Sequence, residues 1–467
     1  PSPVPEVLPG PRDEQGQPLQ VYVKKIQVLG STVLSESELA QVTMPYEQRV
    51  ITTEDLEELR RLLTQRYIDK GYANSGAVIP DQRVQDGIIT IRVIEGILTD
   101  IAVEGTTWFR PSYIRDRLAL STGPPFNMNP LSDRLQLLLQ DSRFERLNAE
   151  VKPGGRPGEA VLDVKVQEAS PLKAWLDFNN FQTPLVGAER GLATIVHQNV
   201  TGVGDQASFT YGQSSGVNPI IDTSYSLPLN AHDTTFSFEY RRNDFVVVES
   251  PFNPLDIKSQ AEIFSLRLRQ PVYRTLTDEV ALMIEGERLF KKTTLLGQPF
   301  DFVPGTKSGT GTVSALRFAQ EWIRRMPERV IAIRSRMSLG IDVLGATINS
   351  GPVADGQFFA WLGQANWVER FASIGMELHN RMDMQIANDR LFPLEQIAVG
   401  GRYSVRGYRE NTLVRDNAFL YSVEARLSVI RSKTGGDILQ FCPFIDFGHS
   451  WAAKGEKVIL VRRETSP

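Results

Sequence analysis

Residues 399–410 read VGGRYSVRGYRE, and this stretch decides how the second half of the chain is interpreted. It holds three glycines, three arginines and no acidic residue before Glu410. Glycine gives the backbone freedom for a tight turn, so the stretch is typical of a loop that carries fixed positive charge. Arginine stays charged in any surroundings, and its planar fork fits a carboxylate. A candidate carboxylate, Asp446, lies farther along the chain in the apolar run FIDFG at residues 444–448.

Together the two stretches resemble the hallmark motifs of the outer-membrane translocase superfamily that combines peptide-binding POTRA domains with a β-barrel. In that family a V-R-G-Y tetrad tips a long loop folded back into the barrel, and its arginine meets the aspartate of an F-x-D-x-G strand. The resemblance implies that Arg406 pairs with Asp446, whereas a basic surface hairpin would explain only the first stretch. The implied site residues are Gly400, Gly401, Val405, Arg406, Gly407, Tyr408 and Glu410 on the loop, and Phe444, Asp446 and Gly448 on the barrel wall.

Composition argues against several classes of protein. The net charge of −4 disfavours a nucleic-acid partner, which would normally require a basic excess. One cysteine, Cys442, and four dispersed histidines leave little room for a disulfide framework or a metal site. No serine or cysteine stands in a nucleophile setting, so we expect no enzyme, no cofactor and no metal. Apolar runs are too short for a transmembrane helix, but barrel strands need only every second residue to be apolar.

Residues 1–19 are expected to form a proline-rich linker. They contain six prolines and few residues to bury, which favours an extended chain. Members of the superfamily often carry an N-terminal helix that plugs the barrel, and this segment does not have the sequence of such a helix.

Residues 20–96 have an α/β pattern in which Thr52 and Asp55 make a capping-box start for a helix with an apolar stripe. The ordered set G-Y, V-I-P-x-Q, G and V-x-E-G looks like the first POTRA domain of two-partner secretion transporters. A POTRA domain offers a groove between its second helix and a strand edge. We therefore expect an extended peptide to add as a further strand between residues 54–70 and 77–80.

Residues 97–169 repeat the β-α-α-β-β order and are expected to form a second POTRA domain. Asn129 and Pro130 are interpreted as the cap and the first-turn proline of its second helix. The match to the sequence motif of the first domain is weaker here, so this prediction depends on topology and position in the chain.

From residue 170 to 467 the helical period gives way to strand-length segments of two-residue alternation, separated by Gly, Asn, Asp and Pro clusters. Segments of about ten to fifteen residues with both signs of charge on their polar faces favour an antiparallel transmembrane β-barrel over a β-sandwich. The charges expected to face the lumen are Arg267, Arg334, Arg336, Glu377, Arg381, Glu424 and Arg426.

About 13 strands are visible in the sequence, with a long inward loop at 392–416 between the eleventh and twelfth, and FIDFG on the thirteenth. Barrels of this family have ~16 strands, an even number as bacterial barrels require. The final stretch, 454–467, lacks the alternating strand with a terminal aromatic residue that relatives use as an assembly signal. We therefore expect an incomplete barrel with its C-terminal end truncated.

The resemblance implies the transporter half of two-partner secretion, which secretes an unfolded exoprotein through the barrel after POTRA domains capture it in the periplasm. The expected partner is an exoprotein such as a large β-helical adhesin, haemolysin or haemagglutinin. The expected location is the Gram-negative outer membrane, in contact with its lipid, with the POTRA domains in the periplasm and the protein a monomer.

Three alternatives differ from this interpretation. An insertase of the same superfamily, which assembles outer-membrane proteins, shares both motifs but usually carries more POTRA domains. A passive porin would explain the barrel but neither the POTRA pattern nor the loop motif. An enzyme would need a passenger domain or a clustered set of reactive side chains, and the sequence indicates neither.

Overall fold

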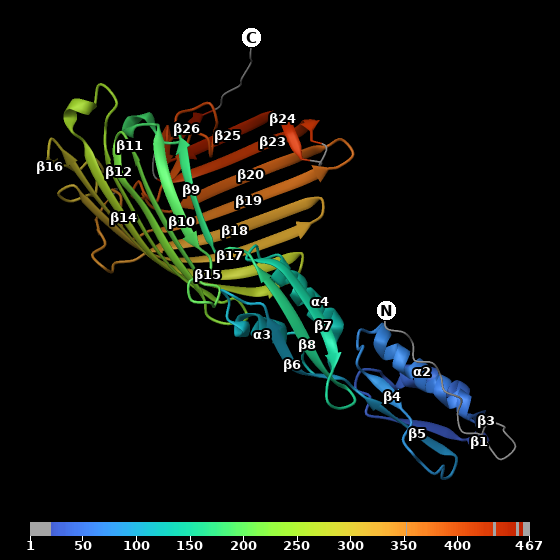
Figure 1. Cartoon of the computed structure of the whole chain (residues 1–467). Coiled ribbons are helices and arrows are strands. Elements are labelled where there is room, and N and C mark those ends of the chain that lie inside the picture. Colours follow the sequence, from blue (N-terminus) through green and yellow to red (C-terminus); the bar gives the residue numbers. More distant parts are fainter. Residues whose placement is uncertain (1–19, 352, 433–435, 454–456, 461–467) are drawn as a thin grey trace. The chain divides into compact units, whose positions relative to one another are not determined.

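The structure is a computed structural model that describes residues 20–351, 353–432 and 436–453 and, for the backbone alone, residues 457–460. The chain divides into two compact units, Pro1–Ala169 and Ser170–Pro467. The linker expected at 1–19 lies outside the described residues, as do residues 454–456 and 461–467 of the expected tail. Figure 1 shows a first unit that combines helices with short strands and a second unit that is one broad, curved sheet. None of the described helices is both long and apolar enough to cross a membrane.

The first unit contains two copies of one β-α-α-β-β arrangement. Its elements are β1 (Gln20–Val23), β2 (Lys25–Leu29), α1 (Glu36–Thr43), β3 (Arg49–Thr52), α2 (Thr53–Asp69), β4 (Gly76–Val78), β5 (Ile88–Ile94), β6 (Ile97–Glu104), α3 (Pro111–Ala119), α4 (Met128–Leu139), β7 (Phe144–Pro153) and β8 (Glu159–Glu168). In the first copy the sheet order is β2-β5-β4, with β2 parallel and β4 antiparallel to β5. In the second copy the order is β6-β8-β7, with β6 parallel and β7 antiparallel to β8.

Helix α2 begins at the capping box that the sequence predicts. The Thr52 hydroxyl accepts the Asp55 N–H at 3.2 Å, and the Asp55 carboxylate accepts the Thr52 N–H at 2.8 Å. The apolar stripe of Leu59, Leu63 and Tyr67 is fully buried in the core of the first copy. Burial of each such side chain contributes about 1.5–3 kcal/mol relative to exposure, which fixes the helix against the sheet.

The predicted cap of helix α4 is wrong by two residues. The helix begins at Met128, and its N-cap is Asn127, whose side chain accepts the Asn129 N–H at 2.9 Å. Asn129 and Pro130 therefore lie inside the first turn. The two asparagines lie two positions apart and both can serve as caps, and packing of the helix selects between them.

Two residues of the POTRA motif hold the first copy together. The Glu95 carboxylate accepts hydrogen bonds from the backbone and the hydroxyl of Thr32, both at 2.6 Å, and from the Tyr67 hydroxyl at 2.8 Å. The Gln82 amide bonds both backbone groups of Thr90 at 2.7 Å and so continues the strand pairing beside β5. These contacts give the V-x-E-G and V-I-P-x-Q residues a structural role in this unit.

The surroundings of Glu95 also indicate how the stability of the first unit changes with pH. Burial alone would raise the pKa of Glu95, but the hydrogen bonds from Thr32 and Tyr67 outweigh it and hold this pKa below its ordinary value. The ionised carboxylate therefore stabilises the fold above an unfolded pKa of about 4.3, and this contribution is lost as the pH falls through the lower folded-state pKa. We expect Glu95→Gln to weaken hydrogen-exchange protection of helix α2 in the whole protein at pH 7 and to have a smaller effect at pH 3. An equal effect at both pH values would contradict a role for the ionised form.

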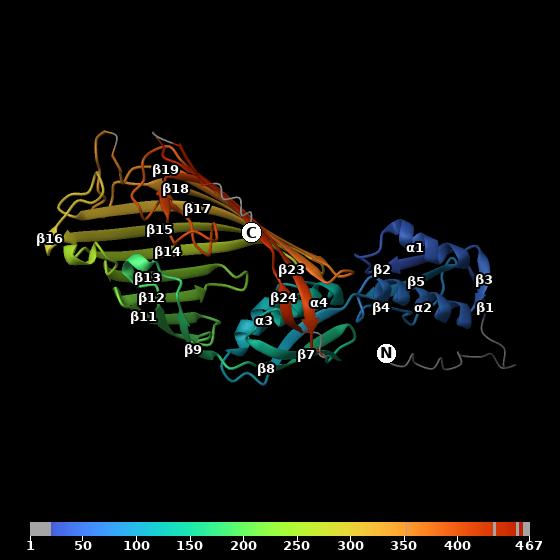
Figure 2. The same ribbon diagram turned by 90° about the horizontal axis from the view of Figure 1, so that it is seen from above.

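The second unit is built from long antiparallel strands. Its elements are β9 (Leu172–Asn179), β10 (Arg190–His197), β11 (Gln206–Ser214), β12 (Val217–Pro228), β13 (Thr235–Val246), β14 (Lys258–Arg274), β15 (Asp278–Leu295), β16 (Gln298–Pro299), β17 (Thr310–Met326), β18 (Arg329–Gly340), β19 (Phe359–Phe371), β20 (Met376–Ala387), β21 (Ile397–Val399), β22 (Leu413–Arg415), β23 (Asn417–Arg431), β24 (Asp437–Phe441), β25 (Phe444–Trp451) and β26 (Lys457–Leu460). Except for the separate pair β21-β22, they form one 16-stranded sheet. Figure 2 shows its long middle strands side by side.

The sheet runs β26-β25-β23-β20-β19-β18-β17-β15 and then β14 back to β9, with the short strands β16 and β24 beside β15 and β23. The thirteen predicted segments all appear in it, and the last of them divides into β24 and β25. Within the described residues β9 pairs only with β10 and β26 only with β25, so the sheet has two free edges. The outer-membrane barrel fold expected from the sequence is therefore present as an unclosed sheet.

The final stretch contains one short strand in addition to those counted in the sequence. Lys457–Leu460 forms β26 and pairs antiparallel with β25. The outer edge of β25 offers unpaired backbone groups, and the apolar, partly β-branched run KVIL suits a strand. A four-residue strand is too short to show an alternating pattern in the sequence.

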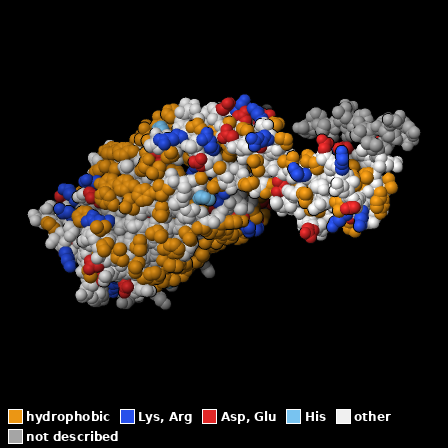
Figure 3. All heavy atoms as spheres, turned by 90° about the horizontal axis from the view of Figure 1, so that it is seen from below, with side chains coloured by type: hydrophobic (Ala, Val, Ile, Leu, Met, Phe, Trp, Pro, Cys, Tyr) orange, Lys and Arg blue, Asp and Glu red, His pale blue; other side chains and the backbone are white. Residues whose placement is uncertain are grey.

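The two faces of the sheet differ in polarity. Figure 3 shows a broad band of hydrophobic side chains on one surface of the strand-rich unit. Strand register places Leu266 and Ile333 on one face of the sheet, where they are 53% and 42% exposed, as expected for side chains that face lipid. On the opposite face, strand register carries one row from Arg334 through Asp383 to Gly448. All seven charges expected to face the lumen lie on the same face as this row: Arg267, Arg334, Arg336, Glu377, Arg381, Glu424 and Arg426.

Candidate functional site

Residues 388–416 connect β20 to β23 and form a finger that lies on the polar face of the sheet. The loop expected at 392–416 falls within this finger. Its stem is the antiparallel pair β21-β22, and its tip is residues 400–412, which contain the V-R-G-Y tetrad. Both ends of the finger continue into the neighbouring strands β20 and β23, and the tip also reaches the opposite part of the sheet, where Arg409 pairs with Glu249 between β13 and β14.

Glycine is required at two positions of the tip. Gly400 and Gly401 have φ angles of +105° and +97°, in the left-handed region where other residues are strained. A Cβ atom at Gly401 would lie 2.0 Å from Oε2 of Glu410. The Glu410 carboxylate in turn accepts the Arg402 N–H at 2.7 Å and closes the turn. Glu410 therefore stabilises the turn of the tip, and other residues of the finger make the contacts with the wall.

Arg406 and Asp446 meet in a bidentate ion pair. Nε of Arg406 donates to Oδ2 of Asp446 at 2.8 Å, and Nη2 donates to Oδ1 at 2.8 Å. The Arg406 backbone N–H also donates to Oδ2 at 2.9 Å. The Asp446 side chain is only 3% exposed and that of Arg406 is 25% exposed. A planar guanidinium held by two parallel bonds to a buried carboxylate fixes both the position and the orientation of the tip.

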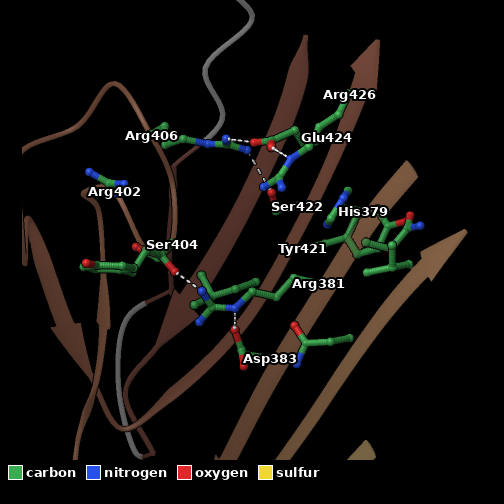
Figure 4. A pocket seen from close by; sticks show the side chains of 15 residues that line it. His379, Arg381, Asp383, Arg402, Ser404, Arg406, Tyr421, Ser422, Glu424 and Arg426 are labelled. Carbon is green, nitrogen blue, oxygen red and sulfur yellow. Dashed lines mark hydrogen bonds and ion pairs between the residues drawn. The ribbon is translucent and has the colours of Figure 1, made fainter. Parts of the chain in front are cut away.

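The rest of the guanidinium is held by the neighbouring strand. Arg406 bonds the Glu424 carboxylate through Nη1 and donates through Nη2 to the Ser422 hydroxyl at 3.1 Å. Ser422 donates to Asp446 at 2.7 Å, and the Phe444 ring lies 3.6 Å from the guanidinium carbon. Figure 4 shows Arg406 directed from the finger toward Glu424 and Ser422. Two carboxylates and one aromatic face thus surround one cation.

Val405, next to Arg406, packs on the wall because of a glycine there. It is 3% exposed and belongs to an apolar cluster with Val399, Ala418 and Leu420. A Cβ atom at Gly448 would lie 2.7 Å from Cγ2 of Val405, which real side chains do not allow. Gly448 of the F-x-D-x-G motif therefore supplies the space into which the V-R-G-Y tetrad fits. Tyr408 is partly buried against the same cluster, and Gly407 has a φ of +88°.

The other predicted wall charges divide into two groups. Arg381 contacts the finger, since its Nη1 donates to the Tyr403 carbonyl at 2.6 Å. Arg426 supports it indirectly by donating to Glu424 at 2.8 Å. Of the remaining four, three have partners elsewhere on the wall: Arg267 bonds Glu285 at 2.9 Å, Arg334 lies 3.6 Å from Glu321, and Glu377 lies 3.4 Å from His379. Arg336 lines a second cavity together with Glu395 and Tyr403 of the finger.

The sequence analysis missed several residues that hold the finger. Ser422 bridges the ion pair, as described above. Asp416 is 2% exposed, and its carboxylate accepts the Leu391 N–H at 2.9 Å, the Ala453 N–H at 3.0 Å and the Gln396 amide at 2.8 Å. Its place directly before a predicted strand gave no signal, because an acidic residue at a strand end is usually solvated.

A polar cavity of about 270 Å³ lies beside the ion pair. Arg381, Asp383, Ser404, Arg406 and Glu424 are among the residues that line it, and Figure 4 shows the wall and finger side chains facing each other across it. In the described part of the chain, His, Cys, Asp and Glu side chains form no group of three or more that could hold a metal ion. The chemistry that this arrangement offers is the passage or positioning of a hydrated, charged segment.

Two α/β copies with the same strand order, followed by a long antiparallel sheet with a finger on its polar face, are the arrangement expected of the outer-membrane translocase class. Residues 158–460 match the family described as haemolysin secretion/activation protein ShlB/FhaC/HecB, and residues 21–96 match the POTRA domain of ShlB type. The chain belongs to the haemolysin secretion/activation protein family. Its members are two-partner secretion transporters of the outer membrane, with POTRA domains in the periplasm.

Individual relatives agree with this assignment. The chain is 21% identical over 446 residues to the outer membrane transporter CdiB of Dickeya dadantii, covering 92% of this chain and 76% of that one. It is 24% identical over 408 residues to the haemolysin transporter protein ShlB of Serratia marcescens, covering 84% and 69%. The solved structure of CdiB from Escherichia coli shares the fold with a TM-score of 0.65 and 19% identity, covering 91% of this chain and 79% of that one. These relatives are transporters rather than enzymes.

Proposed function

We propose that the chain takes an unfolded exoprotein from the periplasm and passes it along the polar face of the sheet, where the finger shapes the conduit. The observation that carries this proposal is the Arg406–Asp446 pair, which holds a basic finger on a wall of mixed charge. Because the wall carries both signs of charge, no single point on it binds a hydrated chain strongly. Folding of the exoprotein outside the cell would give the passage its direction.

Residues 20–96 and 97–169 serve in this proposal as two POTRA domains that capture the exoprotein, and residues 170–467 serve as the pore. The exoprotein is a large β-helical adhesin, haemolysin or haemagglutinin. The repeated topology and the match to a ShlB-type POTRA domain support the first domain directly. The assignment of the second POTRA domain is supported by a strand order equivalent to that of the first copy and by a buried core of its own.

Deletion of the gene tests this function against the insertase alternative. We expect the exoprotein encoded beside the gene to disappear from the culture medium, while the amounts of porins in the outer membrane stay unchanged. Immunoblots of medium and membrane fractions measure both. A fall in porins with normal exoprotein secretion would favour the insertase, and no change in either would contradict both.

One backbone N–H at the strand edge expected to capture the exoprotein already has a hydrogen-bond partner on α2. The Ala77 N–H on β4 donates to the hydroxyl of Thr64 on α2 at 3.1 Å, and this hydroxyl donates to the Arg60 carbonyl at 2.9 Å. An added strand would need the Ala77 N–H for its own carbonyl, so it must displace Thr64. Thr64 therefore competes with the exoprotein for this edge.

Thr64→Val keeps the side-chain shape and removes the competing acceptor. It leaves the Ala77 N–H without its partner until a peptide binds, and one hydrogen bond contributes about 0.5–1.5 kcal/mol net. We therefore expect the purified transporter to bind the N-terminal segment of its exoprotein about two- to tenfold more tightly. Fluorescence titration measures the affinity, and Thr53→Val on the first turn of α2, away from β4, is the matched control. Unchanged affinity with helix α2 still folded would exclude this edge as the capture site.

A further inference from the structure

The finger is held at its foot as well as at its tip. The foot, residues 391–396, rises from β20 toward the stem. Leu391 and Phe392 are 1% and 5% exposed and pack with Val313 and Ala315 of β17 in one apolar cluster. The backbone carbonyl of Glu395 accepts the Gln385 side-chain amide at 3.0 Å. Strands of the middle of the sheet therefore contact the foot, and none of these contacts involves the V-R-G-Y tetrad.

Arg317 on β17 is the only cation that we find bonded to the foot among the described residues. Its Nη2 donates to Glu395 at 2.7 Å and to Glu287 of β15 at 2.5 Å. Its Nη1 donates to the Ser338 hydroxyl of β18 at 2.7 Å. The side chains of Arg317 and Glu395 are 4% and 6% exposed. One guanidinium thus joins three adjacent wall strands to the foot of the finger.

The foot contact and the tip contact are separate. Arg406 is held by β23 and β25, whereas Arg317 is held by β15, β17 and β18. In the sheet, β18, β19 and β20 lie between β17 and β23. Loss of one contact therefore leaves the residues of the other in place, and the finger has two independent points of attachment.

The charge balance at the foot depends on Arg317. Glu287 and Glu395 both bond the same Nη2 atom, so their carboxylates lie close together with one cation between them. Without Arg317 the two carboxylates would lose the cation that bonds both of them and keep only the longer-range attraction of Arg336, which disfavours that arrangement. Glu287 is fixed on a wall strand, so the foot is the part that can move away.

We propose that Arg317 is a positioning residue for secretion, because it fixes the foot of the finger through Glu395 independently of the Arg406–Asp446 pair. This inference rests on the proposed function of the finger. Lysine cannot replace Arg317 fully, since a single ammonium group does not reproduce the fork that spans Glu395, Glu287 and Ser338.

The test combines secretion with a chemical probe of the foot. In the full-length protein with Cys442→Ser, a cysteine is introduced by Ala398→Cys in the stem, and its rate of maleimide labelling is measured. We expect Arg317→Ala to raise this rate at least fivefold and to lower secretion at least tenfold, with Arg317→Lys in between. Arg324→Ala is the matched control, because it removes an arginine of the same strand at an exposed position, where the side chain is 46% exposed. We expect it to change neither quantity.

Two further variants keep the inference testable if Arg317→Ala does not fold. Glu395→Gln leaves the Arg317–Glu287 wall pair intact and is expected to raise labelling in the same direction. Arg317→Glu combined with Glu395→Arg keeps the net charge and is expected to restore part of the secretion. Folding is followed by the heat-dependent shift of the barrel on SDS gels. Unchanged labelling in folded Arg317→Ala or Glu395→Gln would overturn the inference. If labelling rises but secretion stays normal, Arg317 does fix the foot of the finger. The proposed role of the finger in secretion would then be refuted.

Discussion

Arg406→Ala is expected to abolish secretion while the sheet remains inserted in the outer membrane. The substitution leaves Asp446, which is 3% exposed, without its cation, and it removes the partner of Glu424. One-sided loss of a buried pair costs about 3–5 kcal/mol. At about 1.4 kcal/mol per tenfold change, the population of the docked tip should fall by roughly two to four orders of magnitude. Exoprotein in the culture medium, compared with transporter in the membrane fraction, measures the effect.

Arg409→Ala is the matched control for this prediction. It removes an arginine from the same tip, but the Arg409 side chain is 71% exposed and pairs with Glu249 at 2.9 Å. Exposed pairs of this kind contribute about 0–1 kcal/mol, so secretion should stay near the wild-type level. Asp446→Asn should behave like Arg406→Ala. Wild-type secretion from folded Arg406→Ala would refute the role of the ion pair.

Gly448→Leu is expected to reduce secretion at least tenfold with every charge of the site still present. The new side chain would occupy the space of Val405, whose Cγ2 atom lies 2.7 Å from the position of a Cβ atom. Overpacking of this kind costs about 1–3 kcal/mol, and it is relieved here by displacement of the tip from the wall. The tip would then carry Arg406 away from Asp446. Secretion and protease sensitivity of the finger measure the displacement.

The control for Gly448→Leu is Gly286→Leu on β15. A Cβ atom at Gly286 meets no atom within 4 Å, so this variant adds the same side chain without a clash and should secrete normally. A compensating pair sharpens the test, because Val405→Ala removes the methyl groups that Gly448→Ala would meet. The double variant should secrete more than Gly448→Ala alone. Equal secretion by the two would show that Gly448 acts in some other way.

Much of the fold was predictable because the decisive signals are local. Two-residue alternation places side chains on one face or the other of a strand regardless of its neighbours. For this reason all seven expected wall charges lie on one face of the sheet. The capping box at Thr52 and Asp55 likewise depends only on residues close in sequence. Where local signals were ambiguous, as at Asn127 and Asn129, the prediction was wrong, and a segment as short as 457–460 gave no signal.

The contacts of the finger were predictable only where a resemblance supplied them. Arg406 and Asp446 were paired through a known motif, and no pattern in either stretch measures their distance. Glu395, Arg317 and Asp416 belong to no such motif, and each reads as an ordinary charged residue in the sequence. Thr64 is similar, since its position on a helix gives no sign that it bonds the edge of β4.

The sequence by itself determined which residues form strands, which side of the sheet each side chain faces, and which loop carries the fixed positive charge. These properties follow from the period of the backbone and from residue chemistry. Only the tertiary structure decided that Gly448 admits Val405, that Ser422 bridges the ion pair, and that Arg317 holds the foot of the finger. Such contacts join residues far apart in the chain, and their distances depend on strand order and register across the whole sheet.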